Sequence, residues 1–414
     1  MFPTLLPRFL RYVQVDTQSN ADSKTMPSTA KQFDLLRILQ AELQEIGLAE
    51  TQLTENGYVL ATLPATVPHK VPVVMLTAHV DTAPAYSGTN VKPLVHANYQ
   101  GTVIRLPLGE QVLDPAHPNH ADLLTAVGKD VITASGDTLL GADNKAGVAI
   151  LIALAEYLHQ HPEIPHGAIR LVFTPDEEIG RGVNGVTNAE IGAQVGYTID
   201  GGPLGELNWE TFSGDGAEIT IEGVSTHPGD ARKYGMVNAV HLVGKLLSML
   251  PREGISPETT DNHEGFIHPY EITGDAAKVQ LRFILRDHDN DKLAYQGKIL
   301  RSICESLQLS YPTARITCNI FEHYRNMGYW LRNDMRPVEK MIEAARRAGV
   351  EPFTPPVRGG TDGSRFTQRG LPTPNIFSGG HNYHGPLEWI ALQDMEKSVR
   401  TLTELVQLWT EERG

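Results

Sequence analysis

Residues 169–180 read IRLVFTPDEEIG and join a largely apolar run to three consecutive carboxylates, Asp176, Glu177 and Glu178. The apolar run predicts a buried strand. Carboxylates at the end of such a strand repel one another and are poorly solvated. A nearby cation would relieve both costs. Because most acidic clusters are solvated surface turns, this stretch alone leaves both interpretations open.

Composition limits the class of protein. The chain has 414 residues, 41% of them hydrophobic, which is enough for two packed domains. A net charge of -14, without a basic stripe, argues against a nucleic-acid partner. The two cysteines, Cys304 and Cys318, are too few for a disulfide framework, so we expect reduced thiols in a cytosolic protein.

The start of the chain supports a cytoplasmic location. Residues 1–17 lack the charged start, long apolar centre and cleavage site of a signal peptide, and they suit an amphipathic helix. No apolar run is long enough to cross a bilayer. We therefore expect a cytoplasmic protein that has no membrane partner.

Apolar runs alternate with helical patterns, which predicts an α/β domain with a largely parallel sheet. The expected strands are residues 71–77, 169–174, 195–199 and 375–377, and the expected helices are residues 32–46, 145–160, 336–348 and 392–409. Residues 83–137, rich in Pro, His and Gly, are expected to form an irregular embellishment of this domain.

The pattern changes between residues 211 and 322. Segments such as AEITIEG and KVQLRFILR alternate polar with apolar residues, as strands with one solvated face do. Helical patterns cover residues 237–250 and 292–307. The sequence thus predicts a discontinuous catalytic domain, residues 1–210 and 323–414. An inserted α+β domain with an antiparallel sheet, residues 211–322, interrupts it.

Polar residues follow the predicted strands. LTAHVDT places His79 and Asp81 after the first strand, and TIDGG places Asp200 after the third. LLGADNKAG places Asp143 just before a helix, and SGGHNYHG follows the last strand. Ligands bind at the carboxyl ends of strands in open α/β sheets, so these segments should converge. His, Asp and Glu without cysteine form a ligand set for catalytic Zn²⁺ or a similar ion.

Each motif is weak alone, but the ordered set is specific. Together with STHPGDA, RGGTDGS and NYHG, it resembles the co-catalytic zinc metallopeptidase family, which holds aminotripeptidases, desuccinylases, carboxypeptidase G and aminoacylases. The likeness to the aminotripeptidases runs over nearly the whole chain. It implies a zinc-peptidase-like catalytic domain and an inserted domain that serves as lid and dimerisation surface.

The resemblance also implies a metal site with two Zn²⁺ per subunit, for which Co²⁺ or Mn²⁺ could substitute. Asp143 would bridge the ions, and the site would be completed by His79, Glu178, Asp200 and His384. Asp81 would orient the His79 ring, as metal-bound imidazoles require. Glu177 would be the general base.

The late histidine could be His381 or His384. The family's last ligand lies in an H-x-x-x-E pattern, which HGPLE fits from His384 to Glu388, so we choose His384. Two positions depart from the aminotripeptidase pattern, Pro386 and Asn144, and neither is a ligand position.

Four further residues are candidates through the resemblance. His227 would stabilise the oxyanion, and in dimeric relatives it comes from the partner subunit, so a homodimer through the inserted domain is expected. Arg358 would grip the C-terminal carboxylate of the substrate. Asn238 and Arg286 are weaker choices for the same pocket.

The expected function is a zinc-dependent aminopeptidase whose small peptide substrates are tripeptides, from which it releases the N-terminal residue. Within the same family, a dipeptidase, a carboxypeptidase or an N-acyl amino acid deacylase is the alternative. A catalytically silent metal-dependent binding protein is a further one. Such a protein would be expected to lose the base, whereas Glu177 is present.

Overall fold

The computed structural model describes residues 2–48 and 50–411, which divide into two compact units. Unit 1 spans residues 1–209, 329–355 and 361–414, and unit 2 spans residues 210–328 and 356–360. Residues 356–360 join unit 2 through backbone hydrogen bonds of Val357 with Glu210 and Phe212. Within the described part of the chain, no helix is long and apolar enough to span a membrane.

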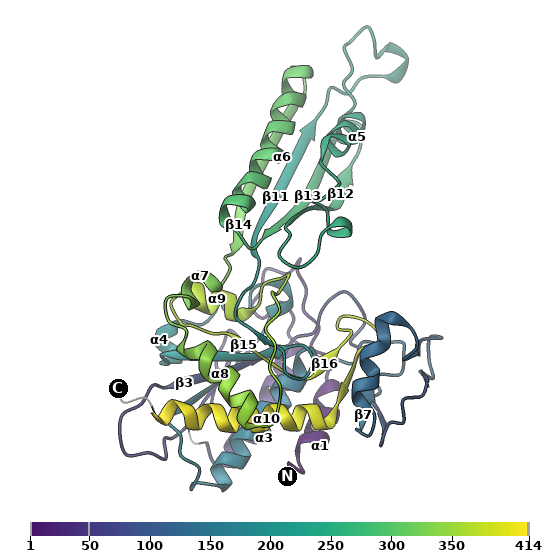
Figure 1. Ribbon diagram of the computed structural model, residues 1–414. Coiled ribbons are helices and arrows are strands. Elements are labelled where there is room, and N and C mark those ends of the chain that lie inside the picture. Colours follow the sequence, from purple (N-terminus) through teal and green to yellow (C-terminus); the bar gives the residue numbers. More distant parts are fainter. Residues whose placement is uncertain (1, 49, 412–414) are drawn as a thin grey trace. The chain divides into compact units, whose positions relative to one another are not determined.

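Unit 1 is built on a seven-stranded mixed sheet (Figure 1). Its order is β1 (Gln52–Leu53), β2 (Val59–Leu63), β8 (Ile169–Thr174), β3 (Val74–His79), β9 (Val195–Gly201), β15 (Asn375–Phe377) and β10 (Leu207–Asn208). The four strands β8, β3, β9 and β15 are parallel, and the outer strands are antiparallel. The predicted fold class, an α/β domain with a mostly parallel mixed sheet, is confirmed.

The strand β3 starts later than predicted. It begins at Val74 instead of residue 71, because Pro72 has no N–H to donate to a sheet, and it continues to His79. All six of its residues are buried, as expected for a strand covered on both faces. His79 is therefore the last residue of a rigid central strand.

Helices cover both faces of this sheet (Figure 1). They are α1 (Leu5–Val13), α2 (Gln32–Ile46), α3 (Ala142–Gln160), α4 (Asn188–Ile191), α8 (Arg336–Arg347), α9 (Asp362–Gln368) and α10 (Leu392–Leu408), and the short α7 (Gly328–Leu331) precedes α8. The helix α3 packs against β3 and β9 and is itself packed by α1 and α10. On the other side, Ile191 of α4 and Phe366 of α9 join Met75 in one apolar cluster.

The stretch that was expected to be irregular, residues 83–137, contains its own strands. A second sheet has the order β16 (Gly380–His381), β17 (Trp389–Ala391), β7 (Val131–Thr133) and β4 (Leu94–His96), and a hairpin joins β5 (Ile104–Arg105) to β6 (Val112–Leu113). The buried Trp389 ring packs with Leu113 and Leu123 beneath this sheet. Chain segments far apart in sequence thus share one small core.

Unit 2 carries the antiparallel sheet that the alternating pattern predicts. Its order is β12 (Phe266–Gly274), β13 (Lys278–Asp287), β11 (Ser213–Glu222) and β14 (Arg315–Tyr324). Buried residues alternate along β13, and α5 (Ala239–Met249) and α6 (Asn290–Ser310) pack on the face that they form. The helix α6 is longer than predicted, since Asp289 caps it by accepting from the N–H groups of Asp291 and Lys292.

Gly147 in α3 tests how closely this helix approaches the sheet. A Cβ atom there would lie 2.3 Å from the carbonyl oxygen of Ile199 and 2.4 Å from Asn144 Oδ1. We expect Gly147→Ala to lower the free energy of unfolding by about 1–3 kcal/mol. Gly244→Ala is the control, because nothing lies within 4 Å of a Cβ on that exposed position of α5. It should stabilise by up to ~1 kcal/mol. Similar denaturation midpoints for both variants would contradict the close packing of α3.

Candidate active site

The carboxyl ends of the parallel strands bring the predicted site residues together. His79 ends β3, and Asp200 is the next-to-last residue of β9. Glu177 and Glu178 lie in the single turn of 3₁₀ helix, Glu177–Ile179, that follows β8. Since parallel strands end at the same edge, segments distant in sequence supply one acidic centre.

Asp143 occupies the centre of this cluster. Its Oδ1 lies 3.0 Å from His79 Nε2, and its Oδ2 lies 3.1 Å from His384 Nε2. His384 Nε2 is also 3.1 Å from Glu178 Oε2, and His79 Nε2 is 3.4 Å from Asp200 Oδ1. The Nε2 atom of each of the two rings thus faces two carboxylates, and Asp143 offers one oxygen to each ring.

The start of α3 explains the position of Asp143. The helix begins three residues earlier than predicted, but its backbone is non-helical at Asp143 and Asn144. Glu388, which is buried, accepts hydrogen bonds from the N–H groups of Leu140, Gly141 and Asp143 at 2.8, 2.8 and 3.0 Å. Its carboxylate therefore fixes the turn that presents Asp143. Sequence reasoning used Glu388 only to choose His384 and missed this contact.

Asp81 links the end of β3 to the turn that follows β8. Its side chain is fully buried, and one oxygen lies 3.3 Å from His79 Nδ1. The two oxygens also accept from the N–H groups of Glu177 at 2.9 Å and Glu178 at 3.2 Å. The contact with Nδ1 leaves Nε2 of His79 facing Asp143 and Asp200. One carboxylate thus orients the ring and fixes the backbone of both glutamates.

Asp176, the first of the three consecutive carboxylates, points away from the cluster. It is buried and accepts hydrogen bonds from the Ser28 N–H and hydroxyl and from the Gln32 side-chain amide. Its φ of 58° lies in the left-handed region, which Asp tolerates better than most residues. The turn after β8 is thereby anchored to the start of α2, and only Glu177 and Glu178 face the cluster.

The electrostatics of the cluster favour a cation. Burial raises the pKa of Glu178 to about 7, and burial with neighbouring carboxylates raises the pKa of Glu177 well above its usual range. The Asp143 and Glu178 carboxylates raise the pKa of His384 to about 11. The two imidazoles of His79 and His384 cannot neutralise the four carboxylates at this edge of the sheet, which belong to Asp143, Glu177, Glu178 and Asp200. A divalent cation would stabilise the ionised forms.

Two sets of ligand atoms are close enough to hold metal ions. The sets are His79, Asp143 and Glu178, and His79, Glu177 and Asp200, with the atoms of each set within 4.8 Å of one another. Glu178 Oε1 is buried and has no hydrogen-bond partner among the described residues. Such an atom is costly unless a ligand satisfies it. The donor set therefore fits one or two divalent cations.

Asp362 is a further buried acid that sequence reasoning missed, although it lies within the quoted motif RGGTDGS. Its Oδ2 accepts from the Thr174 hydroxyl at 2.7 Å, and its charge helps to raise the pKa of Glu177. Burial raises the pKa of Asp362 itself to about 7. Gly182 makes room for it, because a Cβ there would lie 2.2 Å from Asp362 Oδ1.

His381 lies outside the cluster. Its ring stacks on Trp389, with ring centres 3.9 Å apart, and burial lowers its pKa to about 4. An oxygen of Asp122 lies 3.7 Å from His381 Nδ1. Of the two histidines that the sequence offered, the structure brings His384 to Asp143 and Glu178 and places His381 in β16 of the second sheet, against Trp389.

The other four predicted residues belong to unit 2. His227 Nδ1 accepts from the Gly229 N–H, and Asn238 caps α5 by accepting from the N–H groups of Val240 and His241. Both are short local contacts at the starts of helical turns. The His227 ring is exposed, and the catalytic role of His227 and the substrate-binding role of Asn238 stay predictions.

The two arginines differ in how many donors they use. Arg358 donates from both terminal nitrogens to Thr260, Asn262 and Glu264, and its guanidinium lies over the rings of Phe212 and Phe266. These contacts hold the 260–264 loop.

Among the described residues, Arg286 donates from one terminal nitrogen, to the carbonyl oxygens of Asp215 and Leu285, and it lies over Tyr324. It therefore keeps more donors for a ligand than Arg358 does. The substrate-binding roles of both arginines remain predictions.

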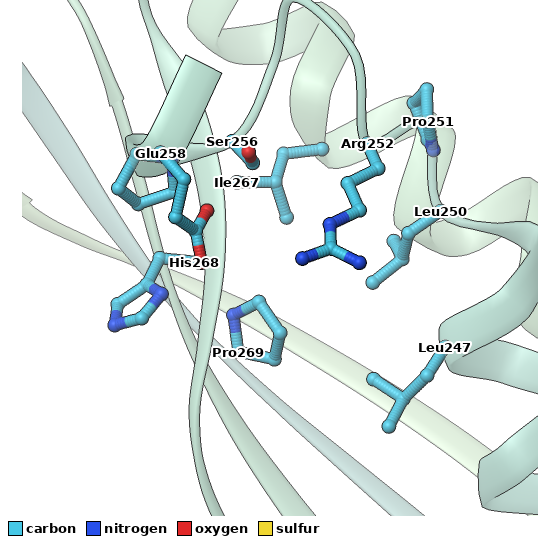
Figure 2. A pocket seen from close by; sticks show the side chains of 10 residues that line it. Leu247, Leu250, Pro251, Arg252, Ser256, Glu258, Ile267, His268 and Pro269 are labelled. Atoms are coloured by element: carbon cyan, nitrogen blue, oxygen red, sulfur yellow. The ribbon is translucent and has the colours of Figure 1, made fainter. Parts of the chain in front are cut away.

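Unit 2 also has a cavity of about 280 Å³ (Figure 2). Figure 2 shows the Arg252 side chain extending between apolar walls that include Leu250, Ile267 and Pro269. The lining contains none of the residues predicted for catalysis, metal binding or substrate binding. The predicted chemistry is therefore not located in this cavity.

An α/β domain whose mixed sheet brings carboxylates and imidazoles together at the carboxyl ends of its strands has a metallohydrolase-like centre. Residues 136–408 match the model of peptidase family M20/M25/M40, and the chain belongs to this family. It is 44% identical to Peptidase T of Desulfitobacterium hafniense (strain Y51), over 99% of each chain. The expected resemblance is confirmed, and the protein is a peptidase.

Solved structures of the family share the fold. A tripeptidase from Staphylococcus aureus superposes with a TM-score of 0.78 at 22% identity, covering 100% of this chain and 99% of that one. A dinuclear metal binding peptidase of the M20 family from Bacillus subtilis gives a TM-score of 0.66 at 15% identity, covering 99% and 98%. At these identities the likeness concerns the fold.

Asp176 should act in folding, and its removal should be measurable as lost stability. Asp176→Asn keeps the volume but removes charge-assisted hydrogen bonds with Ser28 and Gln32, which should cost about 1.5–3 kcal/mol in urea unfolding. Asp34→Asn, at an exposed carboxylate in the same helix as Gln32, is the control and should change stability by less than ~0.5 kcal/mol. Equal, small effects would contradict the anchoring role.

Proposed function

We propose that this protein is a metal-dependent aminopeptidase that releases the N-terminal residue from tripeptides. The observation that carries the proposal is the position of Asp143, whose Oδ1 lies beside the His79 ring and whose Oδ2 lies beside the His384 ring. A carboxylate that offers one oxygen to each of two sites suits a bridging ligand. The names Peptidase T and tripeptidase among the relatives support the substrate class.

The proposed metal ligands are the five residues that the resemblance implies, namely His79, Asp143, Glu178, Asp200 and His384. The unsatisfied Glu178 Oε1 and the surplus of buried carboxylates support them. We propose two Zn²⁺ per subunit, with Co²⁺ or Mn²⁺ as substitutes, because His with carboxylates is a common catalytic zinc set. When bound, the ions supply a water of lowered pKa and polarise the peptide carbonyl.

Glu177 is the proposed general base. Its backbone N–H donates to Asp81, and this contact fixes the backbone position from which the Glu177 side chain extends into the cluster. Burial raises its pKa well above the usual range, with Asp200 and Asp362 adding to the effect, and this favours a group that accepts and returns a proton. Glu177 would take a proton from the attacking water and give it to the leaving amine.

The chain's other proposed roles rest on the resemblance. His227 would stabilise the oxyanion, and Arg358, Arg286 and Asn238 would recognise the C-terminal end of the substrate. The free donors of Arg286 make it the stronger choice for direct contact with a carboxylate, and Arg358 would hold the 260–264 loop. A homodimer formed through unit 2 and a cytoplasmic location belong to the same proposal.

Hydrolysis of matched peptides tests the proposed activity directly. The purified protein with added Zn²⁺ should cleave a free tripeptide and release its N-terminal residue. Activity should fall on the N-acetylated and C-amidated forms and disappear with a chelator. A dipeptide and an N-acyl amino acid measured alongside test the alternatives. Preferred cleavage of either one, or release of the C-terminal residue, would overturn the tripeptide aminopeptidase assignment.

Replacing Glu177 should separate chemistry from metal binding. Glu177→Ala removes the proposed base but none of the five proposed ligands. We expect metal content close to that of the parent protein and a fall in kcat of at least about 10²-fold, the low end of general-base contributions. Metal analysis and steady-state kinetics on one preparation check both points. Loss of both ions with the side chain would make Glu177 a ligand instead.

The two late histidines provide a matched pair for testing the ligand set. His384→Ala removes an imidazole that faces Asp143 and Glu178, so metal affinity should fall by at least about 10-fold. His381→Ala removes a ring stacked on Trp389, so it should cost stability but leave metal affinity nearly unchanged. A metal titration in which His381→Ala shows the larger loss would reverse the assignment.

A further inference from the structure

The protein's only two cysteines both lie in unit 2, on two elements that pack against each other. Cys304 belongs to α6 and Cys318 to the edge strand β14, and both line one cavity of about 520 Å³. Cys304 is buried in the core between the helices and the sheet, and the half-buried Cys318 packs against that core. None of the predicted catalytic or metal-binding residues lines this cavity.

The packing of α6 on β14 explains how the two residues meet. In α6, Cys304 shares the buried face with Leu300 and Leu307, at helical spacing. In β14, Ile316, Cys318 and Ile320 are the partly buried residues that pack against the same core. Each cysteine fills an apolar position of its own element, and the contact between the elements brings the thiols together.

The two thiols are chemically different. The neighbouring Cys318 thiol raises the pKa of Cys304, and burial raises it further. The neighbouring Cys304 thiol lowers the pKa of Cys318, burial opposes this, and Arg301, which lines the same cavity, adds to the lowering. Thiolates are the nucleophiles in thiol chemistry, so Cys318 is the more reactive of the two. It is also the less buried one.

We propose that Cys304 and Cys318 form a redox site in which a peroxide converts the adjacent thiols into an intramolecular disulfide. The carrying observation is that a half-buried thiol on an edge strand and a buried thiol on the packed helix share one cavity. This site is separate from the peptidase centre and does not depend on the proposed tripeptide activity.

The reaction balances with hydrogen peroxide as the oxidant. The Cys318 thiolate attacks one peroxide oxygen, the O–O bond breaks, and the released hydroxide leaves as water with a proton, so that Cys318 becomes a sulfenic acid. Cys304 sulfur then attacks Cys318 sulfur, the S–O bond breaks, and the hydroxyl group leaves as water with the Cys304 proton. Two thiols and one peroxide give one disulfide and two waters.

The disulfide would join α6 to β14 and enclose residues 305–317, which connect them. Both joined elements belong to the core of unit 2, so the bond links parts that already pack together. Closing a loop in this way restricts the unfolded chain. We therefore expect the oxidised protein to unfold at a higher temperature than the reduced protein, and dithiothreitol to reverse the shift.

Peptide mapping after peroxide treatment tests the proposal on the full chain. The reduced, desalted protein is treated with one equivalent of hydrogen peroxide, and its thiols are then blocked under denaturing conditions. We expect both thiols to be lost together and a cross-linked peptide that contains residues 304 and 318. Mapping is preferable to intact mass, because nine methionines also take up oxygen. Dithiothreitol should restore both thiols.

Single variants separate the two roles. In Cys304→Ser, Cys318 should remain as a sulfenic acid that a dimedone probe labels. In Cys318→Ser, the buried Cys304 should lose its thiol at least about 10-fold more slowly than the parent protein does. The double variant is the control for methionine oxidation. Since the parent protein carries the main result, the test does not depend on the folding of any variant.

Three results would overturn the proposal. They are a sulfinic acid on Cys318 with Cys304 still reduced, a disulfide between two chains in place of the intramolecular one, and survival of both thiols at one equivalent of peroxide. An equal rate of thiol loss in the two single variants would contradict the assignment of Cys318 as the attacking thiol.

Discussion

The buried carboxylate of Asp81 is the contact on which the geometry of the site depends. It touches the His79 ring at the end of β3 and accepts from the backbone of Glu177 and Glu178 after β8. These strands are parallel neighbours, so their ends already lie side by side. Asp81 converts this proximity into a fixed relation between an imidazole and two carboxyl groups. The Asp81 carbonyl oxygen also contacts His79 Nδ1, and Asp176 anchors the same turn to α2, so the Asp81 carboxylate acts together with these contacts.

The three consecutive carboxylates at residues 176–178 show how an acidic cluster can be divided between folding and chemistry. Asp176 takes its hydrogen bonds from Ser28 and Gln32, and Glu178 faces His384. Within the described part of the chain, no imidazole lies at hydrogen-bond distance from the Glu177 side chain, and burial keeps its pKa high. The repulsion expected from the sequence is thus reduced because Asp176 points away from the other two groups. The remaining repulsion acts among the carboxylates of the cluster, where a cation is proposed to bind.

The sequence predicted the fold class and the convergence of the site residues, since both depend on local patterns. An unbroken apolar run places His79 at a strand end, and an alternating run identifies the strand β13 of the antiparallel sheet. Element boundaries were less accurate. The start of α3 was missed because Asp143 and Asn144 lie in a non-helical turn inside it. The stretch of residues 83–137 was expected to be irregular because its strands are only two or three residues long.

Contacts between distant segments could not be predicted from one sequence. Ser28 and Asp176 are 148 positions apart, and Glu388 and Leu140 are 248 apart. Nothing in the local sequence around Asp176 or Glu388 marks them as acceptors for these N–H groups. The neighbouring thiols of Cys304 and Cys318 were missed for a related reason, because each cysteine fits the apolar pattern of its own element. Their contact arises only when α6 packs on β14.

These distant contacts also determine what a cation would have to do at this site. Asp81, Asp176 and Glu388 are buried acids whose oxygens are satisfied largely by N–H groups, and they fix His79, the turn after β8 and Asp143. The protein's own hydrogen bonds therefore set the positions of the proposed ligands before any ion binds. Folding of the chain therefore already includes the unfavourable free energy of bringing these carboxylates together. A bound ion would mainly reduce the repulsion between them. Ligands held in this way favour binding, because little conformational freedom remains to be lost.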